Sequence, residues 1–500
     1  MTELYKGSYD YFEGILPESE KGKYKYIPTI PALLEHCEKN FADKPALGND
    51  NGTVTYKEMC DNIAKRRGLL AAAGLKFGDR VAVFSPNTTD AIEAYLAVMS
   101  AGCVVIMLPA ALPVQAVAGI CAKFRVSALI ANFDEEQKKL MPTQVLPLKD
   151  GYGEPAPAAE LSPLDAAAIY FTGGTTGAPR GACLNHGALT RGGYNGIFTP
   201  SVSENDVYIT MLPLSHVFGS IRGLLTALYT GALVYECPDM KAGLGKIPMI
   251  RPTILVLVPG LAEILLGIAK MRGAGFLGGR LQTIISGAAP VPPRLVKLFE
   301  EFRVNLLPGY GLTETANLVS GNGDIANRPD SVGRIYGEQE LRLVDGEIQI
   351  KGDCVMTGYF GDPDATAAAF DGEWFRTGDL GRVDEDGFLY ITGRIKNLIL
   401  LPNGENVSPE EIEEVFYKNP LVRDCVAFAD ESSGRPVIAI EILPEAAAVA
   451  GADDERVREL LEGVVADANA KLPEFKRVTK LIVRREDFER SPAMKILRKH

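Results

Sequence analysis

The sequence predicts an α/β protein. We expect a large N-terminal domain of helix-covered, mainly parallel sheets that includes a small β-rich subdomain, followed by a small α+β C-terminal domain. Up to about residue 330, short apolar runs alternate with helical patterns, and from about residue 332 short strands follow one another instead. The chain has 500 residues, 46% of them hydrophobic, so it can bury a large core and divide into at least two domains.

The first series of elements begins with a helix. Thr55 and Glu58 form a capping-box pattern, which predicts a helix that starts there and runs toward Gly74. The elements that follow are a strand at 80–84, a helix at 89–101, a strand at 104–108, a helix near 115–123 and a strand at 127–131. Because β and α units of this length alternate, we expect a parallel sheet with helices on both faces.

A second series of buried strands follows a glycine-rich loop. These strands are expected at 207–211, 232–237, 253–258, 281–286 and 304–307. Ligands of such sheets bind outside the carboxyl ends of the strands. The glycine-rich loop and Gly309-Tyr310-Gly311 both follow strand ends, so they are candidates for one site.

The last third of the chain divides again. The β-rich subdomain is predicted from strands at 341–344, 347–351 and 387–391, and the C-terminal part from a helix at 409–417, a hairpin across 426–428 and 437–442, a helix at 453–471 and a strand near 478–483. A break in the pattern at 393–397 separates the two parts. We therefore expect domains at 1–393 and 394–500.

Composition excludes several classes of protein. The net charge is −12 and no Lys/Arg-rich cluster occurs, which disfavours a nucleic-acid partner. The eight cysteines are scattered singly and only four histidines are present, so a Cys/His zinc site is not expected. Unpaired cysteines fit a reducing cytosol, and the polar N-terminus does not resemble a secretory signal. We expect a cytoplasmic protein.

One uncharged stretch, 94–122, is long enough to cross a bilayer. Gly102, Pro109 and Pro113 interrupt it, and the interruptions favour a helix, a strand and a second helix buried in the α/β core. No transmembrane segment is therefore predicted.

The stretch 170–181, YFTGGTTGAPRG, is the most informative in the chain. It follows the apolar run 166–171, which is expected to be a buried strand. Glycines allow successive backbone N–H groups to converge on an anion, threonine hydroxyls add donors, and Arg180 adds positive charge. This composition predicts a phosphate-binding loop, although a flexible turn is the alternative. It lacks the Walker pattern, so the mechanism of the P-loop NTPases is not implied.

Further motifs follow in a fixed order. They are LPLSHVFG at 212–219, SGAAP at 286–290, GYGLTET at 309–315, GEIQIKG at 346–352, WFRTGDLG at 374–381, GRIKN at 393–397 with Gly404 and PEEIE at 409–413, and KILR at 495–498. Over nearly the whole chain this series resembles the adenylate-forming superfamily, the AMP-binding acyl-CoA synthetases and their relatives.

The resemblance implies a two-step reaction. A carboxylate attacks the α-phosphate of Mg-ATP to give acyl-AMP and pyrophosphate, and a thiol, usually that of coenzyme A, then displaces AMP to give a thioester. Because two anions must meet in the first step, the site needs positive charge and oriented donors. The implied cofactors and substrates are ATP, Mg²⁺, coenzyme A and a small carboxylic acid.

The family's phosphate and metal contacts fall on residues of two motifs. The positions that would hold the β- and γ-phosphates are Thr172, Gly173, Gly174, Thr175, Thr176, Gly177 and Arg180. Glu314 matches the carboxylate that binds Mg²⁺, and oxygen ligands are what Mg²⁺ requires. Thr313 would contact the α-phosphate. Alternatively, Thr313 and Glu314 could cap a helix.

The nucleoside contacts are implied for residues farther along the chain. Asp379 matches the residue that accepts both ribose hydroxyls, and Arg394 would reach the same ribose. Tyr310 and Ala288 would flank the adenine, and Gly311 belongs to the same nucleotide-binding motif. Without the neighbouring motifs, TGDLG would be interpreted as a surface turn and Tyr310 as core packing.

Two further residues are expected to act in catalysis. His216 occupies the family's position beside the carboxylate-binding end of the acyl tunnel, where it would gate or contact the acid, although a lone His in an apolar stretch is usually a core residue. Lys495 corresponds to the lysine that bridges the reacting carboxylate and the α-phosphate. The alternative for Lys495 is a solvated basic tail.

The resemblance also implies that the C-terminal domain is mobile. It would rotate about Lys396 between the two steps and bring Gly404 against the pantetheine chain, where the lack of a side chain leaves room.

The sequence departs from the family at four positions. Gly173 stands where Ser is usual, Arg180 where Lys is usual, and Asn397 where Asp is frequent. Met494 replaces the usual Gly before Lys495, which could impair the first step.

These observations predict an ATP- and Mg-dependent carboxylic acid–CoA ligase for a fatty or aryl acid. Two alternatives are an enzyme that passes its acyl group from acyl-AMP to an acyl carrier protein, and a catalytically silent binding homologue.

Overall fold

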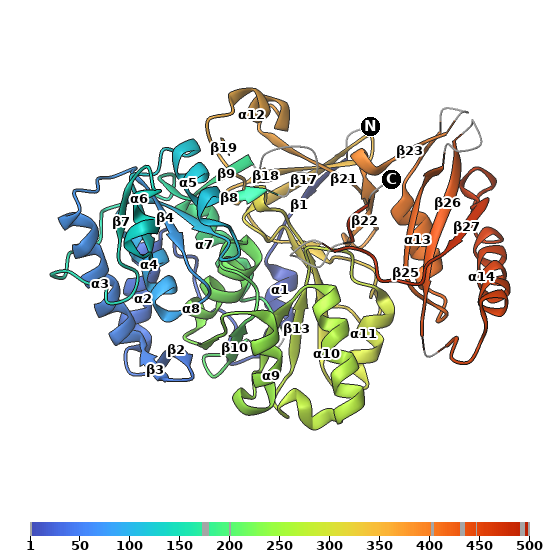
Figure 1. Ribbon diagram of the computed structural model, residues 1–500, viewed down its shortest axis with the longest axis horizontal. Helices are drawn as coiled ribbons and strands as arrows, with labels where there is room; N and C mark the ends of the chain where they lie inside the picture. Colours follow the sequence, from blue (N-terminus) through green and yellow to red (C-terminus); the bar gives the residue numbers. More distant parts are fainter. Residues whose placement is uncertain are drawn as a thin grey trace.

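The computed structural model describes residues 3–172, 180–199, 202–401, 405–430, 436–446, 448–490 and 496–498. The α/β class predicted from the sequence is confirmed: two large sheets with flanking helices are followed by a β-rich sheet and a smaller C-terminal unit. Figure 1 shows the C-terminal elements at one end of the long axis and the first large sheet at the other.

The first sheet has seven strands in the order β19-β9-β8-β5-β4-β6-β7. Their bounds are β4 (Arg80–Phe84), β5 (Val104–Leu108), β6 (Ala128–Ala131), β7 (Gln144–Leu146), β8 (Ala166–Thr172), β9 (Arg180–Asn185) and β19 (Gly358–Tyr359). The pairs formed among strands β4 to β8 are all parallel, as expected. Strands β8 and β9 are antiparallel, so the glycine-rich segment joins two neighbouring strands of one ladder.

Helices cover both faces of this sheet. They are α2 (Ile30–Phe41), α3 (Tyr56–Ala72), α4 (Thr89–Ser100), α5 (Val114–Lys123), α6 (Glu135–Lys139) and α7 (His186–Asn195). The predicted capping box starts α3: Thr55 N donates to Glu58 Oε2 at 2.7 Å, and Glu58 N donates to Thr55 Oγ1 at 3.2 Å. These two bonds satisfy donors that a helix start would otherwise leave free.

The second sheet has nine strands in the order β16-β15-β14-β13-β12-β10-β11-β2-β3. Their bounds are β2 (Pro45–Asn49), β3 (Gly52–Thr55), β10 (Val207–Thr210), β11 (Leu233–Glu236), β12 (Ile254–Leu257), β13 (Thr283–Ser286), β14 (Asn305–Tyr310), β15 (Ser320–Gly321) and β16 (Arg334–Ile335). All five strands of the predicted second series are present, and they run parallel.

The helical segments of this part pack on the second sheet or between the two sheets. They are α1 (Asp10–Ile15), the π-helix η1 (Phe218–Leu225), α8 (Thr226–Thr230), α9 (Met240–Ile250), α10 (Pro259–Arg272), the 3₁₀ turn η2 (Ala274–Leu277), α11 (Pro293–Glu300) and the 3₁₀ turn η3 (Thr313–Thr315). Helix α7 and η1 pack together, and η1 also lies on β10 and β12. One hydrophobic core runs through both large sheets.

The β-rich sheet has the order β1-β17-β18-β21-β20, with β22 paired to β21. Its strands are β1 (Glu3–Lys6), β17 (Gln339–Val344), β18 (Glu347–Gly352), β20 (Phe370–Asp371), β21 (Trp374–Val383) and β22 (Leu389–Arg394), and the helix α12 (Pro363–Ala369) lies beside it. The sequence did not indicate β1, which pairs antiparallel with β17 (Figure 1).

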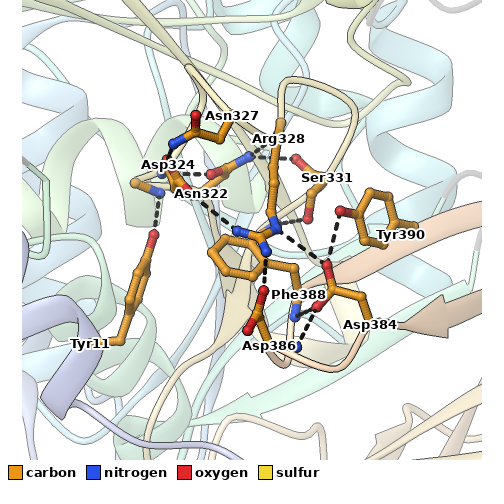
Figure 2. A network of polar contacts seen from close by, with 12 residues as sticks. Tyr11, Asn322, Asp324, Asn327, Arg328, Ser331, Asp384, Asp386, Phe388 and Tyr390 are labelled. Carbon is orange, nitrogen blue, oxygen red and sulfur yellow. Dashed lines mark hydrogen bonds and ion pairs between the residues drawn. The ribbon is translucent and has the colours of Figure 1, made fainter.

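A half-buried arginine, Arg328, holds the β21–β22 hairpin against the rest of the N-terminal part (Figure 2). Arg328 donates to Asp384 at 3.3 Å and to Asp324 at 3.1 Å, and it also pairs with Asp386. Its guanidinium lies 4.3 Å from the centre of the Phe388 ring. Because three carboxylates share one arginine, the network fixes the turn of this hairpin and thereby the positions of the two strands.

The C-terminal unit has its own hydrophobic core. Its elements are the 3₁₀ turn η4 (Ile395–Asn397), β23 (Ile399–Leu400), β24 (Asn406–Val407), α13 (Pro409–Tyr417), β25 (Val422–Asp430), β26 (Val437–Pro444), α14 (Asp454–Asn469), the 3₁₀ turn η5 (Glu474–Lys476) and β27 (Lys480–Val483). It contacts the larger unit through Arg294, which donates to Glu263 and to the carbonyl oxygen of Arg423, both at 3.1 Å. Within the described ranges, no helix is both long and apolar enough to cross a membrane.

Candidate active site

Three strand ends meet at one edge of the two large sheets. Strand β8 ends at Thr172, β13 at Ser286 and β14 at Tyr310. Strands β13 and β14 are parallel neighbours, with Ser286 opposite Pro308, so their carboxyl ends lie side by side. Open α/β sheets bind ligands at such an edge, which is where most of the sequence-predicted residues fall.

The predicted phosphate loop is seen only at its two flanks. Gly173, Gly174, Thr175, Thr176 and Gly177 lie outside the described residues. Thr172 is half-buried and faces Arg180 across the β8–β9 ladder.

Arg180 is exposed at the start of β9. Its Nε lies 3.7 Å from Asp362, and its guanidinium lies 5.5 Å from the centre of the Tyr359 ring. This arrangement leaves a cation at the solvent side of the strand ends.

A tyrosine holds the predicted metal ligand. Glu314 lies in η3, and the hydroxyl of Tyr359 donates to its Oε1 at 2.9 Å. Burial raises the pKa of Glu314, whereas the bond from Tyr359 and the positive charge of Arg394 oppose that rise. The backbone of Glu314 is also fixed, because Met356 N donates to its carbonyl oxygen at 2.8 Å. Thr313 is the first residue of the same turn and is half-buried.

Sequence reasoning missed Tyr359. It lies 45 residues beyond Glu314 in the chain, on the edge strand β19 of the first sheet, whereas Glu314 lies in the turn η3 after β14. A single Tyr after a glycine forms no sequence motif, so nothing near it in the sequence indicates a site residue. Its phenol pKa is raised by burial and by the Glu314 charge, so it stays a hydrogen-bond donor at neutral pH.

The predicted ribose-binding residues form one hydrogen-bonded group. Asp379 on β21 is 6% exposed, and its Oδ2 accepts from the Tyr310 hydroxyl at 2.7 Å. Its Oδ1 accepts from Arg394 Nε at 2.5 Å, and the two residues are register partners in the β21–β22 ladder.

The charges within this group influence one another. Burial works to lower the pKa of Arg394, but the Asp379 carboxylate together with Tyr310 and Glu314 outweighs it, and the net pKa is raised. The pKa of Tyr310 is raised by burial and by the same carboxylate. Asp379 thus accepts from two donors and could exchange them for ligand hydroxyls.

Two backbone features shape the predicted adenine side. Ala288 is exposed and has φ +66, a left-handed conformation that turns the chain sharply after β13. Gly311 must be glycine because a Cβ there would stand 1.6 Å from the carbonyl oxygen of Asn317. Ala288 lies in the turn after β13, and Gly311 directly follows Tyr310 at the end of β14.

The His216 side chain is exposed, so it is not a core histidine. Its carbonyl oxygen accepts from the backbone N–H groups of Gly219 and Ser220, both at 3.0 Å, at the entry to η1. The ring of Phe218 lies 3.6 Å from the point where a Cβ on Gly287 would stand, so this entry faces the turn after β13.

The connection to the C-terminal unit begins directly after Arg394. Lys396 lies in η4, and its pKa is lowered by burial and by the neighbouring charge of Arg394. Asn397 donates from Nδ2 to Glu410 at 2.6 Å. Gly404, Met494 and Lys495 lie outside the described residues.

The described residues of the site therefore divide into two groups. Tyr310, Glu314, Asp379 and Arg394 influence one another through hydrogen bonds or charge. His216 and Ala288 form the second group: His216 precedes η1, and Ala288 lies in the turn after β13, which Phe218 of η1 approaches. The combination of oriented acceptors, fixed arginine charge and a buried carboxylate suits the binding of a nucleotide and its metal.

Protein-family models match most of the chain. Residues 34–360 match the family described as AMP-binding enzyme, and residues 396–500 match the AMP-binding enzyme C-terminal domain.

Named proteins are similar to it over a comparable span. The chain is 34% identical to indoleacetate–CoA ligase of Aromatoleum aromaticum over 63% of each chain. It is 30% identical to feruloyl-CoA synthase of an Amycolatopsis species, covering 76% of this chain and 81% of that one. The crystal structure of ATP-bound MatB from Rhodopseudomonas palustris is 25% identical with a TM-score of 0.81, covering 94% of this chain and 97% of that one.

Proposed function

Because this chain belongs to the AMP-binding enzyme family, we propose that it is an ATP-dependent carboxylic acid–CoA ligase that works through an acyl-adenylate. The single observation that carries the proposal is the position of Asp379 at the strand ends: it accepts hydrogen bonds from Tyr310 and Arg394 and lies near Glu314. The relatives at 34% and 30% identity are named as a CoA ligase and a CoA synthase of aryl-substituted acids. An aryl or fatty acid is therefore the proposed substrate class.

In the first step the chain's own residues orient ATP. Asp379 accepts the ribose hydroxyls, and Tyr310 and Ala288 flank the adenine beside Gly311. Thr172 and Arg180 hold the phosphates together with Gly173, Gly174, Thr175, Thr176 and Gly177, and Thr313 contacts the α-phosphate. His216 contacts the acid, and Lys495 bridges the reacting carboxylate and the phosphate. Positive charge from Arg180, Arg394 and Lys495 reduces the repulsion between the two anions.

Glu314 fits a magnesium ligand. It is a carboxylate held in a partly protected turn, and Mg²⁺ in nucleotide sites takes one or two carboxylates along with phosphate oxygens. When bound, Mg²⁺ supplies charge neutralisation at the phosphates. Tyr359 then keeps the carboxylate oriented toward that position.

For the second step we propose that units 1–393 and 394–500 change their relative orientation about Lys396. The separate core of the C-terminal unit and the short η4 connection after Arg394 support such a motion. Gly404 would then approach the pantetheine of coenzyme A. The eight free cysteines agree with a cytoplasmic location.

The test is acid-dependent ATP–pyrophosphate exchange across a panel of aryl and alkyl acids, followed by thioester detection with CoA. Exchange and thioester formation together support the ligase. Exchange without formation of a CoA thioester would contradict CoA as the acceptor and support an acyl carrier protein in its place. No exchange with any acid, in protein shown to be folded and to bind ATP, contradicts it.

A further inference from the structure

Arg222 is an unusual residue for the interior of a protein. It lies in the π-helix η1 and is only 1% exposed, which makes it one of the largest fully buried side chains of the chain. Arginine is almost never fully buried unless its charge is paired. Its surroundings therefore need an explanation.

The guanidinium lacks the partners that burial requires. Neither Nη1 nor Nη2 of Arg222 has a hydrogen-bond partner among the residues that the structure describes. Asp206 is a nearby carboxylate, but Thr253 Oγ1 and Ser203 N donate to its two oxygens, each at 2.7 Å. A buried charge with free donors is strongly unfavourable, so an acceptor is missing at this point.

A second unpaired donor faces Arg222. Tyr208 on β10 is 1% exposed, and its hydroxyl, whose oxygen the Arg222 guanidinium approaches, donates to no described residue. Burial raises the pKa of Tyr208 to about 12, and the adjacent Arg222 charge opposes that rise. A guanidinium fork beside a phenol O–H is a donor set that matches the two oxygens of a carboxylate.

The position of Arg222 connects it with the proposed acid site. It follows His216 by six residues, and η1 begins between them at Phe218. Phe218 lies four residues earlier, so it shares a face of η1 with Arg222, and its ring packs toward Gly287 at the end of β13. The segment from His216 into η1 thus connects the proposed acid site with the buried guanidinium.

We propose that the acid activated by this chain is a dicarboxylic acid whose second carboxylate is bound by Arg222 and Tyr208. This inference rests on the proposed ligase function and narrows its substrate. The first carboxylate reacts at the His216 end, and the second neutralises the buried arginine. A methyl-terminated acid of the same length would leave the charge unpaired and bring an apolar group against it.

The first experiment compares matched acids in ATP–pyrophosphate exchange. Unbranched diacids of four to ten carbons are tested beside the monoacids of equal length, and 3-(4-carboxyphenyl)propanoate beside 3-phenylpropanoate. The monoamide of the best diacid keeps its shape and removes one charge. We expect the diacid to exceed both the monoacid and the monoamide in kcat/KM on the order of 100-fold. A preference for the monoacid overturns the inference and leaves the ligase standing, whereas exchange with none of the acids overturns both.

The second experiment changes the proposed site. In Arg222→Met the kcat/KM for the diacid should fall on the order of 100-fold and that for the monoacid should rise, so the preference inverts. Arg66→Met is the matched control, because Arg66 is 3% exposed but paired with Glu93 at 3.1 Å. We expect Arg66→Met to lower the Tm and Arg222→Met not to lower it. If kcat/KM for the diacid and the monoacid fell equally in Arg222→Met, and the Tm fell as in the control, Arg222 would have a structural role and the inference would be overturned.

A third readout does not depend on turnover. The best diacid, without ATP, should raise the Tm of the parent, and the monoacid at the same concentration should not. Tyr208→Phe should reduce that shift and lower the diacid-to-monoacid ratio of kcat/KM. A Tm shift that is the same for the two acids contradicts a second carboxylate site.

Discussion

Arg394 and Asp379 face each other across β22 and β21, and Nε of the arginine donates to Oδ1 of the aspartate at 2.5 Å. The next residues after Arg394 begin the connection to the C-terminal unit. The Asp379 carboxylate therefore binds Arg394, which lies two residues before the proposed hinge Lys396. The same carboxylate is the proposed acceptor for the ribose hydroxyls. If both proposals hold, nucleotide binding and the orientation of the two units should be linked through this side chain.

Asp379→Asn should lower kcat/KM for ATP at least about tenfold, because an amide offers one acceptor where the carboxylate offers two and carries no charge for Arg394. The sharper measurement is the ratio of kcat/KM for ATP and 2′-deoxyATP, which should fall toward one in the variant. Asp384→Asn, on the same hairpin but bound to Arg328, is the control and should keep the parental ratio. An unchanged ratio in Asp379→Asn would remove the ribose assignment.

Tyr359→Phe should raise the Mg²⁺ concentration needed for half-maximal exchange, roughly tenfold or more, because Glu314 loses the bond that orients it. Saturating Mg²⁺ should restore most of the rate. Tyr390→Phe removes a similar tyrosine–carboxylate bond, at 3.1 Å to Asp384, and should leave the Mg²⁺ requirement unchanged. If both variants behave alike, Tyr359 does not position a metal ligand.

Gly311→Ala should lower the Tm and exchange activity together, since its Cβ would collide with the Asn317 carbonyl oxygen at 1.6 Å. Gly267→Ala is the matched control. Gly267 lies inside α10 with nothing within 4 Å of its Cβ position, so alanine should stabilise the helix by roughly 0.5–1 kcal/mol. Thermal unfolding of both variants distinguishes steric conflict from a general response to the substitution.

The stability of the protein should depend on pH through Glu236. Burial raises its pKa from 4.5 to about 7. The folded state therefore holds a proton that the unfolded state has already lost, and this stabilisation disappears as the pH rises from about 4.5 to about 7.

Glu236→Gln removes that titration. The Tm difference between Glu236→Gln and the parent should thus increase from pH 5 to pH 8, by the equivalent of at most roughly 3 kcal/mol. Glu136→Gln, on the exposed side of α6, should show no such change. A constant difference across this range would mean that Glu236 does not titrate as described.

Lys495→Ala tests the role that the family resemblance implies for the C-terminal lysine. Acyl-AMP formation should fall on the order of 100-fold or more, while thioester formation from supplied acyl-AMP should be largely retained. Separate assays of the two half-reactions measure this. Equal effects on both steps would support the alternative interpretation, in which Lys495 belongs to a solvated basic tail.

Much of the fold could be predicted because its signals are local. The strand expected at 80–84 has those bounds in the structure, and the capping box at Thr55 starts α3 as expected. The family and its nucleotide motifs were also recognisable, since each motif is a short run of neighbouring residues. The relative direction of neighbouring strands could not be predicted in the same way. Apolar runs do not specify whether two strands are parallel, so the antiparallel β8–β9 pair was not expected.

The parts of the site that could not be predicted depend on distant contacts. Tyr359 on β19 acquires its role from Glu314, which lies far away in the chain in the turn η3. Arg222 would be expected at the surface from its residue type, and only the packing of η1 on β10 and β12 buries it. In both cases the role of the side chain depends on contacts between residues that are distant in the sequence, which a local pattern does not reveal.

The pairing of β1 with β17 has a consequence for synthesis. Glu3 is the register partner of Leu343, so 340 residues (343 minus 3) separate two neighbours in the sheet. At about 5–20 residues per second, a ribosome takes roughly 20–70 s to produce the second after the first. During that interval the first strand of the nascent chain has no edge to join, and the earliest segment to emerge is among the last to be ordered.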